Sequence, residues 1–313
     1  MELKNNLTFF NASQKETFFK TFPHHDRFKT FFNTAQGLGQ YERSIHTDVA
    51  DMSYDDLEKA CQGVKIYLPE HLSRFKTVLA AYIEWQASQG NENAKELATV
   101  LFRIRYNADQ HLQEYLIRDP RDIINALEKR YPSHQAYYEP VVAILCWAGL
   151  DYGMICSLPV DALTEIDGTL KIQLDSYVLE IKDPEQVRII NAYLRIKDGS
   201  IVDRGNYSPA VMVTDRLLRI VPSARGVEIT SISVDLMRRK MSAAFHVCCA
   251  SYPGGIIGLQ KSGYCNRLYL AEKDGVTDLI QYIKSNEPSA PESERKIKNL
   301  IDMYYSYKKV YNL

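Results

Sequence analysis

The feature that most constrains the fold is an uncharged apolar run, residues 140–150, which is followed at once by Asp151. This run is roughly half as long as a helix that spans a bilayer. It therefore predicts a helix buried in the core of a globular domain. A second helix over residues 154–158 follows and is stopped by Pro159.

The chain is 313 residues long, which favours two domains. Hydrophobic residues make up 45% and charged residues 25%, so both halves can bury a core. The N-terminal part predicts helices over residues 54–61 and 69–85 and a further helix that ends near Leu116. Asp119 and Pro120 fit the cap and first turn of a new helix. We therefore place the junction there, with domains at 1–116 and 120–313.

A period of two replaces the helical period after Pro159. Apolar residues alternate with polar ones over 170–174 and again over 177–181, which predicts a hairpin that turns near Asp175 and Ser176. Further helices are expected at 184–196 and 233–247, and two more close the chain on either side of a loop at 286–293. The predicted fold class is mainly α with a small antiparallel β-sheet.

This order of elements resembles the tyrosine recombinases, also called phage integrases, over nearly the whole chain. In that family an apolar helix ends in a Gly-Leu-Arg turn and leads through a second helix into a hairpin. Here Ala148-Gly149-Leu150 keeps the frame, but Asp151 stands where the family has its first catalytic arginine. The resemblance implies a helical core-binding domain, residues 1–116, and an α+β catalytic-like domain, residues 120–313.

The second family motif, His-x-Leu-Arg-(His/Lys)-(Ser/Thr), best matches residues 257–262. The match puts Ile257 at the histidine position and Gln260 at the second arginine position, while Lys261 and Ser262 agree with the motif. Family members clamp the scissile phosphate with the two arginines while a tyrosine attacks it. The resemblance therefore implies a degenerate site with no catalytic residue.

Two further family positions have several candidates each. Lys171 and Lys182 both lie on the predicted hairpin and match the family lysine weakly. Of the tyrosines near the C-terminus, Tyr305 or a neighbour stands where the family has its nucleophile, although such an aromatic stripe is more often core or interface. The other tyrosines of this stripe are Tyr304, Tyr307 and Tyr311.

Basic residues gather in one segment although the net charge of the chain is only −1. Residues 204–273 carry ten basic and four acidic side chains, an excess of about six, and such an excess marks either a phosphate-binding face or a solvated surface. On the resemblance, the expected DNA-contacting residues come from both domains. They are Arg74, Lys76, Arg103, Arg105, Arg225, Arg238, Arg239, Lys240, Lys261, Asn266 and Arg267.

No cofactor or metal is expected. His246, Cys248, Cys249 and Cys265 offer four ligand types, but adjacent cysteines rarely chelate one zinc ion and buried free thiols are common. The six cysteines form no disulfide framework, and no signal peptide or membrane span is predicted, which favours a reducing cytoplasm. The resemblance implies that this is a bacterial cytoplasm, with association to the nucleoid. Expected partners are double-stranded DNA and a second copy bound through the C-terminal helix. The sequence leaves open whether a protein or peptide antagonist exists.

These observations favour a sequence-specific DNA-binding repressor on an inactive recombinase-like scaffold. Within the family the chain is similar to the integrase-like lysogeny repressors of SPβ-type phages, which implies a role in keeping lytic genes off. Two alternatives stay open. The first is an active, divergent recombinase with Tyr305 or a neighbour as nucleophile. The second is an accessory or architectural protein that acts by contacting another recombinase.

Overall fold

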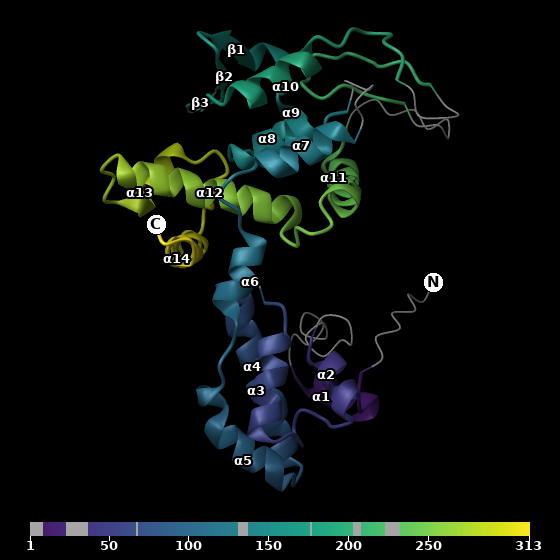
Figure 1. Cartoon of the computed structure of the whole chain (residues 1–313), viewed down its shortest axis with the longest axis vertical. Helices are drawn as coiled ribbons and strands as arrows, with labels where there is room; N and C mark the ends of the chain where they lie inside the picture. The colour runs from purple at the N-terminus through teal and green to yellow at the C-terminus, as the bar shows by residue number, and fades with distance from the viewer. Residues whose placement is uncertain are drawn as a thin grey trace. The chain divides into compact units, whose positions relative to one another are not determined.

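The computed structural model describes residues 9–22, 37–66, 68–130, 137–175, 177–202, 208–222 and 232–313. The chain divides into two compact units, Met1–Gln113 and Glu114–Leu313, here called unit 1 and unit 2 (Figure 1). The division falls within helix α6, close to the junction that the sequence suggests.

In the described part of unit 1, all the secondary-structure elements are helices, joined by turns. Ser53 caps the first predicted helix through its Oγ, which accepts a hydrogen bond from Asp56 N at 3.2 Å. The prediction of a single continuous helix that ends near Leu116 is wrong. The helix is interrupted because residues 104–107 run without helical hydrogen bonds while Ile104 enters the core. The elements are α1 (Ala12–Thr21), α2 (Leu38–Ile45), α3 (Tyr54–Gly63), α4 (Pro69–Ser88), α5 (Glu92–Val100), the 3₁₀ turn η3 (Leu101–Arg103) and α6 (Ala108–Tyr115).

The core of unit 1 contains an ionic cluster that hydrophobic periodicity did not predict. Lys15 on α1 is fully buried, and its Nζ lies 2.6 Å from Glu42 Oε1 and 2.7 Å from Asp48 Oδ2. The Tyr82 hydroxyl donates to the same Asp48 carboxylate. Burial raises the pKa of Glu42 to about 7, since removal from water penalises the ionised form more than Lys15 stabilises it. Phe18 and Phe19 of α1 pack into the same core, while Phe28, Phe31 and Phe32 lie outside the described residues.

Unit 2 surrounds the apolar helix that the sequence predicted. That helix, α8, is buried along nearly its whole length, as expected from the uncharged run that begins at Pro140, and Glu139 in its first turn is buried as well. Three helices, not the predicted two, follow α11, because Gly275 at φ +94° ends α12 before α13 begins. The helices are α7 (Arg121–Lys129), α8 (Glu139–Trp147), α9 (Tyr152–Ser157), the 3₁₀ turn η4 (Val160–Ala162), α10 (Pro184–Leu194), α11 (Val234–Cys248), α12 (Gly255–Lys273), α13 (Leu279–Asn286) and α14 (Glu294–Tyr311).

The predicted hairpin forms, and one more strand extends it. Strands β2 (Thr169–Gln173) and β3 (Val178–Ile181) pair antiparallel with Ile172 opposite Leu179, so their apolar residues share the buried face. A preceding strand, β1 (Leu163–Ile166), was not predicted and pairs with β2 through a turn at Asp167 and Gly168. The fold class is confirmed in the described residues: mainly helical, with one three-stranded antiparallel sheet.

Helix α12 packs very closely on α8. A Cβ atom on Gly263 would lie only 2.1 Å from the carbonyl oxygen of Trp147, so no larger side chain fits there without moving backbone. This close approach brings the N-terminal half of α12 against the turn that follows α8. It thereby places the two recombinase-like segments, around Asp151 and around Gln260, in one region of unit 2.

Helix α14 closes the other side of α12. Its apolar face, which includes Ile297, Met303 and Tyr307, is buried within unit 2. The Tyr304 hydroxyl donates to Glu272 of α12 at 2.5 Å, and Lys308 pairs with the same carboxylate. The C-terminal helix is thus part of the core of its own unit. Within the described part of the chain, no helix combines the length and the apolar character needed to cross a membrane.

Candidate nucleic-acid interface

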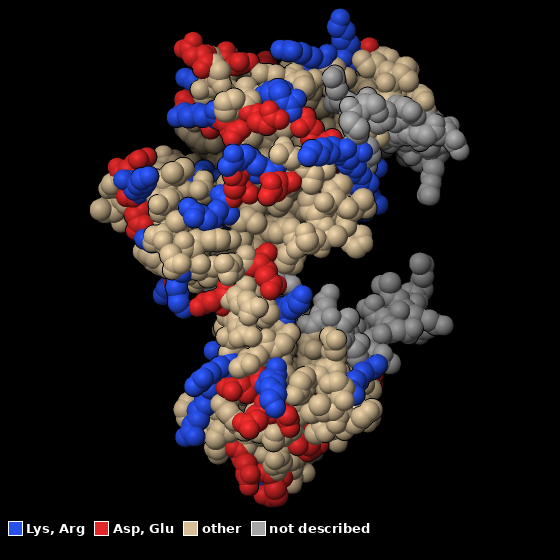
Figure 2. Space-filling model, in the orientation of Figure 1, with Lys and Arg blue, Asp and Glu red and all other residues tan. Residues whose placement is uncertain are grey.

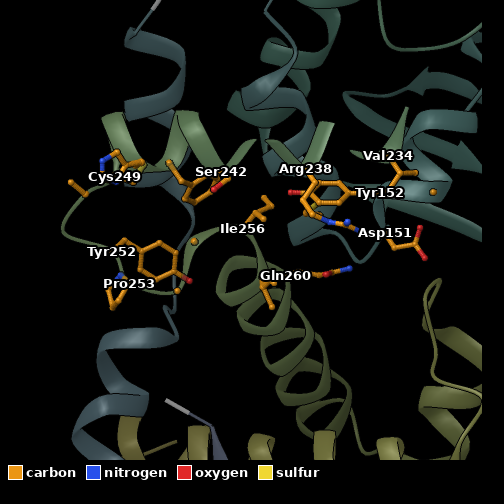
Figure 3. Close-up of a pocket in the computed structure, with 18 residues that line it drawn as sticks. Asp151, Tyr152, Val234, Arg238, Ser242, Cys249, Tyr252, Pro253, Ile256 and Gln260 are labelled. Atoms are coloured by element: carbon orange, nitrogen blue, oxygen red, sulfur yellow. The ribbon is translucent and has the colours of Figure 1, made fainter. Parts of the chain in front are cut away.

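A cavity of about 910 Å³ lies in unit 2 between the α8–α9 turn, α11 and the N-terminal end of α12 (Figure 3). Its lining residues include Asp151, Ile257 and Gln260, the three positions where the sequence departs from the recombinase motifs. Residues more than 100 positions apart in the sequence therefore meet in one place.

The turn that presents Asp151 has a well-defined geometry. Leu150 N donates to Leu145 O and Gly149 N donates to Cys146 O, the two bonds of a Schellman helix end. Gly149 has φ +111°, and a Cβ atom there would lie 2.7 Å from the Arg267 guanidinium. Glycine is required at this position by both its backbone conformation and the approach of Arg267.

Asp151 begins helix α9. Its Oδ1 accepts a hydrogen bond from Met154 N at 2.9 Å, which satisfies one of the free amides of the first helical turn. The carboxylate is exposed at the edge of the cavity. Asp151 therefore has a structural role as a helix cap, and it places negative charge where the related motif has positive charge.

Gln260 and Ile257 occupy the facing wall on α12. The Gln260 Nε2 donates to the carbonyl of Leu150 at 3.2 Å, so its amide supports the turn that presents Asp151. The side chain of Ile257 is 59% exposed and lines the cavity with no polar group. Neither residue can supply the positive charge or the proton that the family motif provides at these positions.

Arg238 is the only predicted DNA-contacting residue among the described lining residues of this cavity. Figure 3 shows its side chain beside Tyr152, on the wall formed by α11 and the start of α9. Its guanidinium also forms an exposed ion pair with Asp235 at 3.0 Å. Arg239 and Lys240 are exposed on the same helix, and basic side chains gather over α11 in Figure 2.

The Arg267 side chain, in contrast, makes its contacts inside unit 2. Its Nη2 lies 2.7 Å from Oε2 of Glu287, whose side chain is fully buried, and its Nη1 donates to the Trp147 carbonyl. Only 19% of the Arg267 side chain is exposed. The predicted DNA contact is not favoured here, because the guanidinium already holds the end of α8 and the Gly149 turn.

The remaining predicted contacts are distributed over both units. Lys261 and Asn266 are half-buried on α12, and Arg225 lies outside the described residues. In unit 1 the expected cations are exposed on α4 and on the segment after α5. They are Arg74, Lys76, Arg103 and Arg105. The candidate interface therefore includes α11 in unit 2 and a separate basic segment in unit 1.

The two hairpin lysines both lie beside Glu180. Lys171 sits opposite Glu180 in the β2–β3 register, with Nζ 3.6 Å from Oε1, and Lys182 Nζ is 3.0 Å from Oε2. These pairs lower the pKa of Glu180, mainly through its hydrogen bond with Lys182. Neither lysine lines the cavity among the described residues, so they do not substitute for the missing arginines.

None of the C-terminal tyrosines lines the cavity in the described part of the chain. Tyr305 is 52% exposed and borders a separate hollow with Thr277 and Ile301. Tyr304 is buried, and this burial raises the pKa of its phenol above the ordinary value. The neighbouring Glu272 carboxylate raises the same pKa further. Tyr307 is buried in the core, and the Tyr311 hydroxyl donates a hydrogen bond to the carbonyl of Leu116.

Two tyrosines that the sequence did not single out, Tyr152 and Tyr252, do line the cavity. The Tyr152 hydroxyl is buried and has no hydrogen-bond partner among the described residues. Burial raises the pKa of both phenols, which makes the phenolate form unfavourable at neutral pH. Because Tyr152 directly follows Asp151, only the folded turn reveals that its ring faces the cavity.

The histidine and cysteines near the end of α11 are the candidate metal ligands that the sequence offers. No cluster of three or more possible metal ligands occurs within the described ranges. Burial raises the pKa of the Cys249 thiol to about 11, so this side chain stays protonated at neutral pH. Cys265 is buried in α12, apart from the residues that line the cavity. These thiols therefore contribute to packing.

A comparison with solved structures found similar chains. The chain is similar to the crystal structure of XerA recombinase, with a TM-score of 0.38 and 12% sequence identity, over 97% of this chain and 99% of that one. Searches against protein-family models and against curated proteins found no match.

Proposed function

We propose that the protein binds duplex DNA at specific sequences, represses transcription there and does not cut the strand. The observation that carries this proposal is the cavity in which Asp151, Ile257 and Gln260 meet. On the sequence resemblance these positions correspond to the two arginines and the histidine of the family, but here they carry a carboxylate, an amide and an alkyl group.

Strand cleavage by a tyrosine needs positive charge around the scissile phosphate, because negative charge builds on its oxygens in the transition state. Loss of one such donor typically costs about 10²–10³ in rate. Here two arginine positions are occupied by Asp151 and Gln260, and the Asp151 carboxylate repels a phosphate. A tyrosine elsewhere in the chain has little to stabilise the reaction.

DNA binding makes weaker demands on any single residue. Affinity for the backbone comes from several phosphate contacts and the release of counterions, so it survives the loss of a catalytic arginine. Arg238, Arg239 and Lys240 lie exposed on α11, and this helix also presents Ser242 and His246 at the cavity. Side chains of these types can contact both phosphates and base edges.

Repression would follow from occupation of a promoter without cleavage, and keeping a prophage silent is the use that the sequence resemblance suggests. The test begins with recovery of the DNA that the protein occupies in a bacterial genome. The recovered sites are then placed upstream of a reporter gene. We expect specific binding and reduced transcription. No affinity for any duplex, or binding without an effect on the reporter, would contradict the proposal.

One observation favours a second candidate, a divergent recombinase. A guanidinium, that of Arg238, does reach the cavity and lies beside Tyr152 (Figure 3). A suicide substrate with a nick near the recovered site separates the two functions, because cleavage traps a covalent protein–DNA adduct. We expect no adduct. An adduct that disappears in Tyr152→Phe or Tyr305→Phe would establish the enzyme instead.

A further inference from the structure

The most exposed large hydrophobic side chain in the described residues belongs to unit 1. The ring of Phe102 is 80% exposed, more than any other large hydrophobic side chain described. It occupies the middle of the 3₁₀ turn η3, directly after helix α5. A single exposed apolar residue needs no special explanation by itself, so its surroundings decide what it does.

The turn that carries Phe102 is fixed on both sides. Ile104, two residues later, is buried in the core of unit 1, and Leu101 packs against that core. The backbone amide of Arg105 donates to Glu58 Oε1 on α3 at 3.0 Å. Phe102 is therefore held outward by an anchored turn, so its exposure is a property of the folded unit.

The neighbours of Phe102 are cationic. The Arg103 guanidinium lies 5.3 Å from the centre of the Phe102 ring, and Arg105 is exposed two residues further on. Lys76 on α4 lies over the ring of Tyr106 at 4.7 Å, which brings a third positive charge to the same segment. Glu58 is the acidic group that contacts this segment, and its Oε1 also accepts a hydrogen bond from Tyr54.

An aromatic ring that projects between arginines fits nucleic acid better than it fits an apolar protein surface. The cations bind phosphates, while an apolar ring can enter between base steps or stack on a base. Burial of this ring against DNA would also remove its apolar surface from water, which is favourable. A protein partner would instead leave Arg103 and Arg105 to be desolvated without a defined acidic counterpart.

We propose that Phe102 is a direct contact to duplex DNA, with its ring inserted against the bases and Arg103 and Arg105 bound to the flanking phosphates. This inference rests on the proposed DNA binding and adds a residue that reads or deforms the duplex from unit 1. It predicts two separable contributions: an apolar one from Phe102, which is insensitive to salt, and an electrostatic one from the arginines.

The experiment measures binding of the full-length protein to a recovered genomic site by fluorescence anisotropy over a range of salt concentrations. The variants are Phe102→Ala, Phe102→Leu and the Arg103→Ala/Arg105→Ala pair. Ile280→Ala, which shortens another exposed apolar side chain, is the matched control. We expect Phe102→Ala to weaken binding about tenfold with an unchanged salt slope. Phe102→Leu should keep most of the affinity, and the arginine pair should reduce the slope.

A second measurement detects the ring in the duplex. 2-Aminopurine is placed at successive positions of the site, and its fluorescence rises where a neighbouring base is unstacked. We expect a rise at one step with the unaltered protein and none with Phe102→Ala. Equal affinity of Phe102→Ala and the unaltered protein would overturn the inference alone, and a change only in self-association would do the same. No binding by the unaltered protein would overturn the proposed function, and this inference with it.

Discussion

The side-chain amide of Gln260 donates a hydrogen bond to the carbonyl of Leu150, 3.2 Å away, and Leu150 directly precedes Asp151. Helix α12 therefore touches the α8–α9 turn, so the two segments that the sequence analysis compared with recombinase motifs are in contact. In this chain the contact is neutral and structural. The hydrogen bond maintains the shape of the turn, but it brings no positive charge that could stabilise a phosphate during strand cleavage.

Restoring one arginine should not restore cleavage. Asp151→Arg leaves Gln260 and Ile257 unchanged, so we expect no nicking of supercoiled DNA that carries a recovered site. The substitution also removes the cap of α9, which costs about 1 kcal/mol and should lower the melting temperature of unit 2 by about 2–4 °C. Asp151→Asn, which keeps a capping oxygen, should melt close to the unaltered protein. Nicking by the single arginine variant would refute this account of the site.

The basic face of α11 should contribute electrostatically to DNA binding. Arg238→Ala with Arg239→Ala should weaken binding and reduce the slope of log affinity against log salt by about 0.9 for each phosphate that is no longer neutralised. The control is Arg188→Ala on α10, another exposed arginine, which is paired with Glu128 and Glu185. A slope that stays unchanged in the α11 variant, or falls as much in the control, would exclude α11 from the interface.

The Arg267–Glu287 pair should stabilise unit 2 more than any surface ion pair. Arg267→Ala leaves the fully buried Glu287 carboxylate without its partner, which typically costs about 3–5 kcal/mol. Denaturant unfolding of each single variant and of the double variant Arg267→Ala/Glu287→Gln gives the interaction energy. We expect the double variant to be more stable than the sum of the single losses predicts. Strict additivity would mean that the two side chains act independently.

Unit 1 should become less stable as the pH rises from about 4.5 to 7. Burial raises the pKa of Glu42 from 4.5 to about 7 in the folded protein, so the folded state binds more protons than the unfolded state in that interval. The stabilisation is complete below pH 4.5 and is lost as the pH passes 7. Glu42→Gln, which is neutral at every pH, should flatten the melting temperature over this range. A melting temperature of the unaltered protein that rises with pH there would show the opposite sign.

Removal of α14 should destabilise unit 2 itself. A chain that ends at Ser293 lacks the buried side chains of Ile297, Met303 and Tyr307, so α12 loses its apolar cover. We expect loss of the cooperative melting transition together with aggregation in light scattering. Tyr304→Phe removes only the hydrogen bond to Glu272 and should cost about 0.5–1.5 kcal/mol while the protein stays folded. A truncated chain with unchanged melting would place α14 outside the core.

The sequence predicted the parts of the fold that follow from local periodicity and motif spacing. The buried helix α8 and the β2–β3 hairpin are of this kind. The strand β1 was missed because its burial pattern is mostly exposed and gives no alternation. The ion pair between Arg267 and Glu287 was missed for a different reason. Glu287 lies 20 residues away from Arg267 in a loop whose conformation no sequence pattern predicts.

The Gly149 turn depends on residues that are made much later in synthesis. Ser289 donates from its Oγ to the carbonyl of Gly149 at 2.7 Å across 140 residues, and Glu287 holds Arg267 against the same turn. On a ribosome, α8 emerges long before either residue exists, and contacts so distant in sequence form slowly. The pocket wall that carries Asp151 is therefore completed only after residues 287–289 have left the exit tunnel.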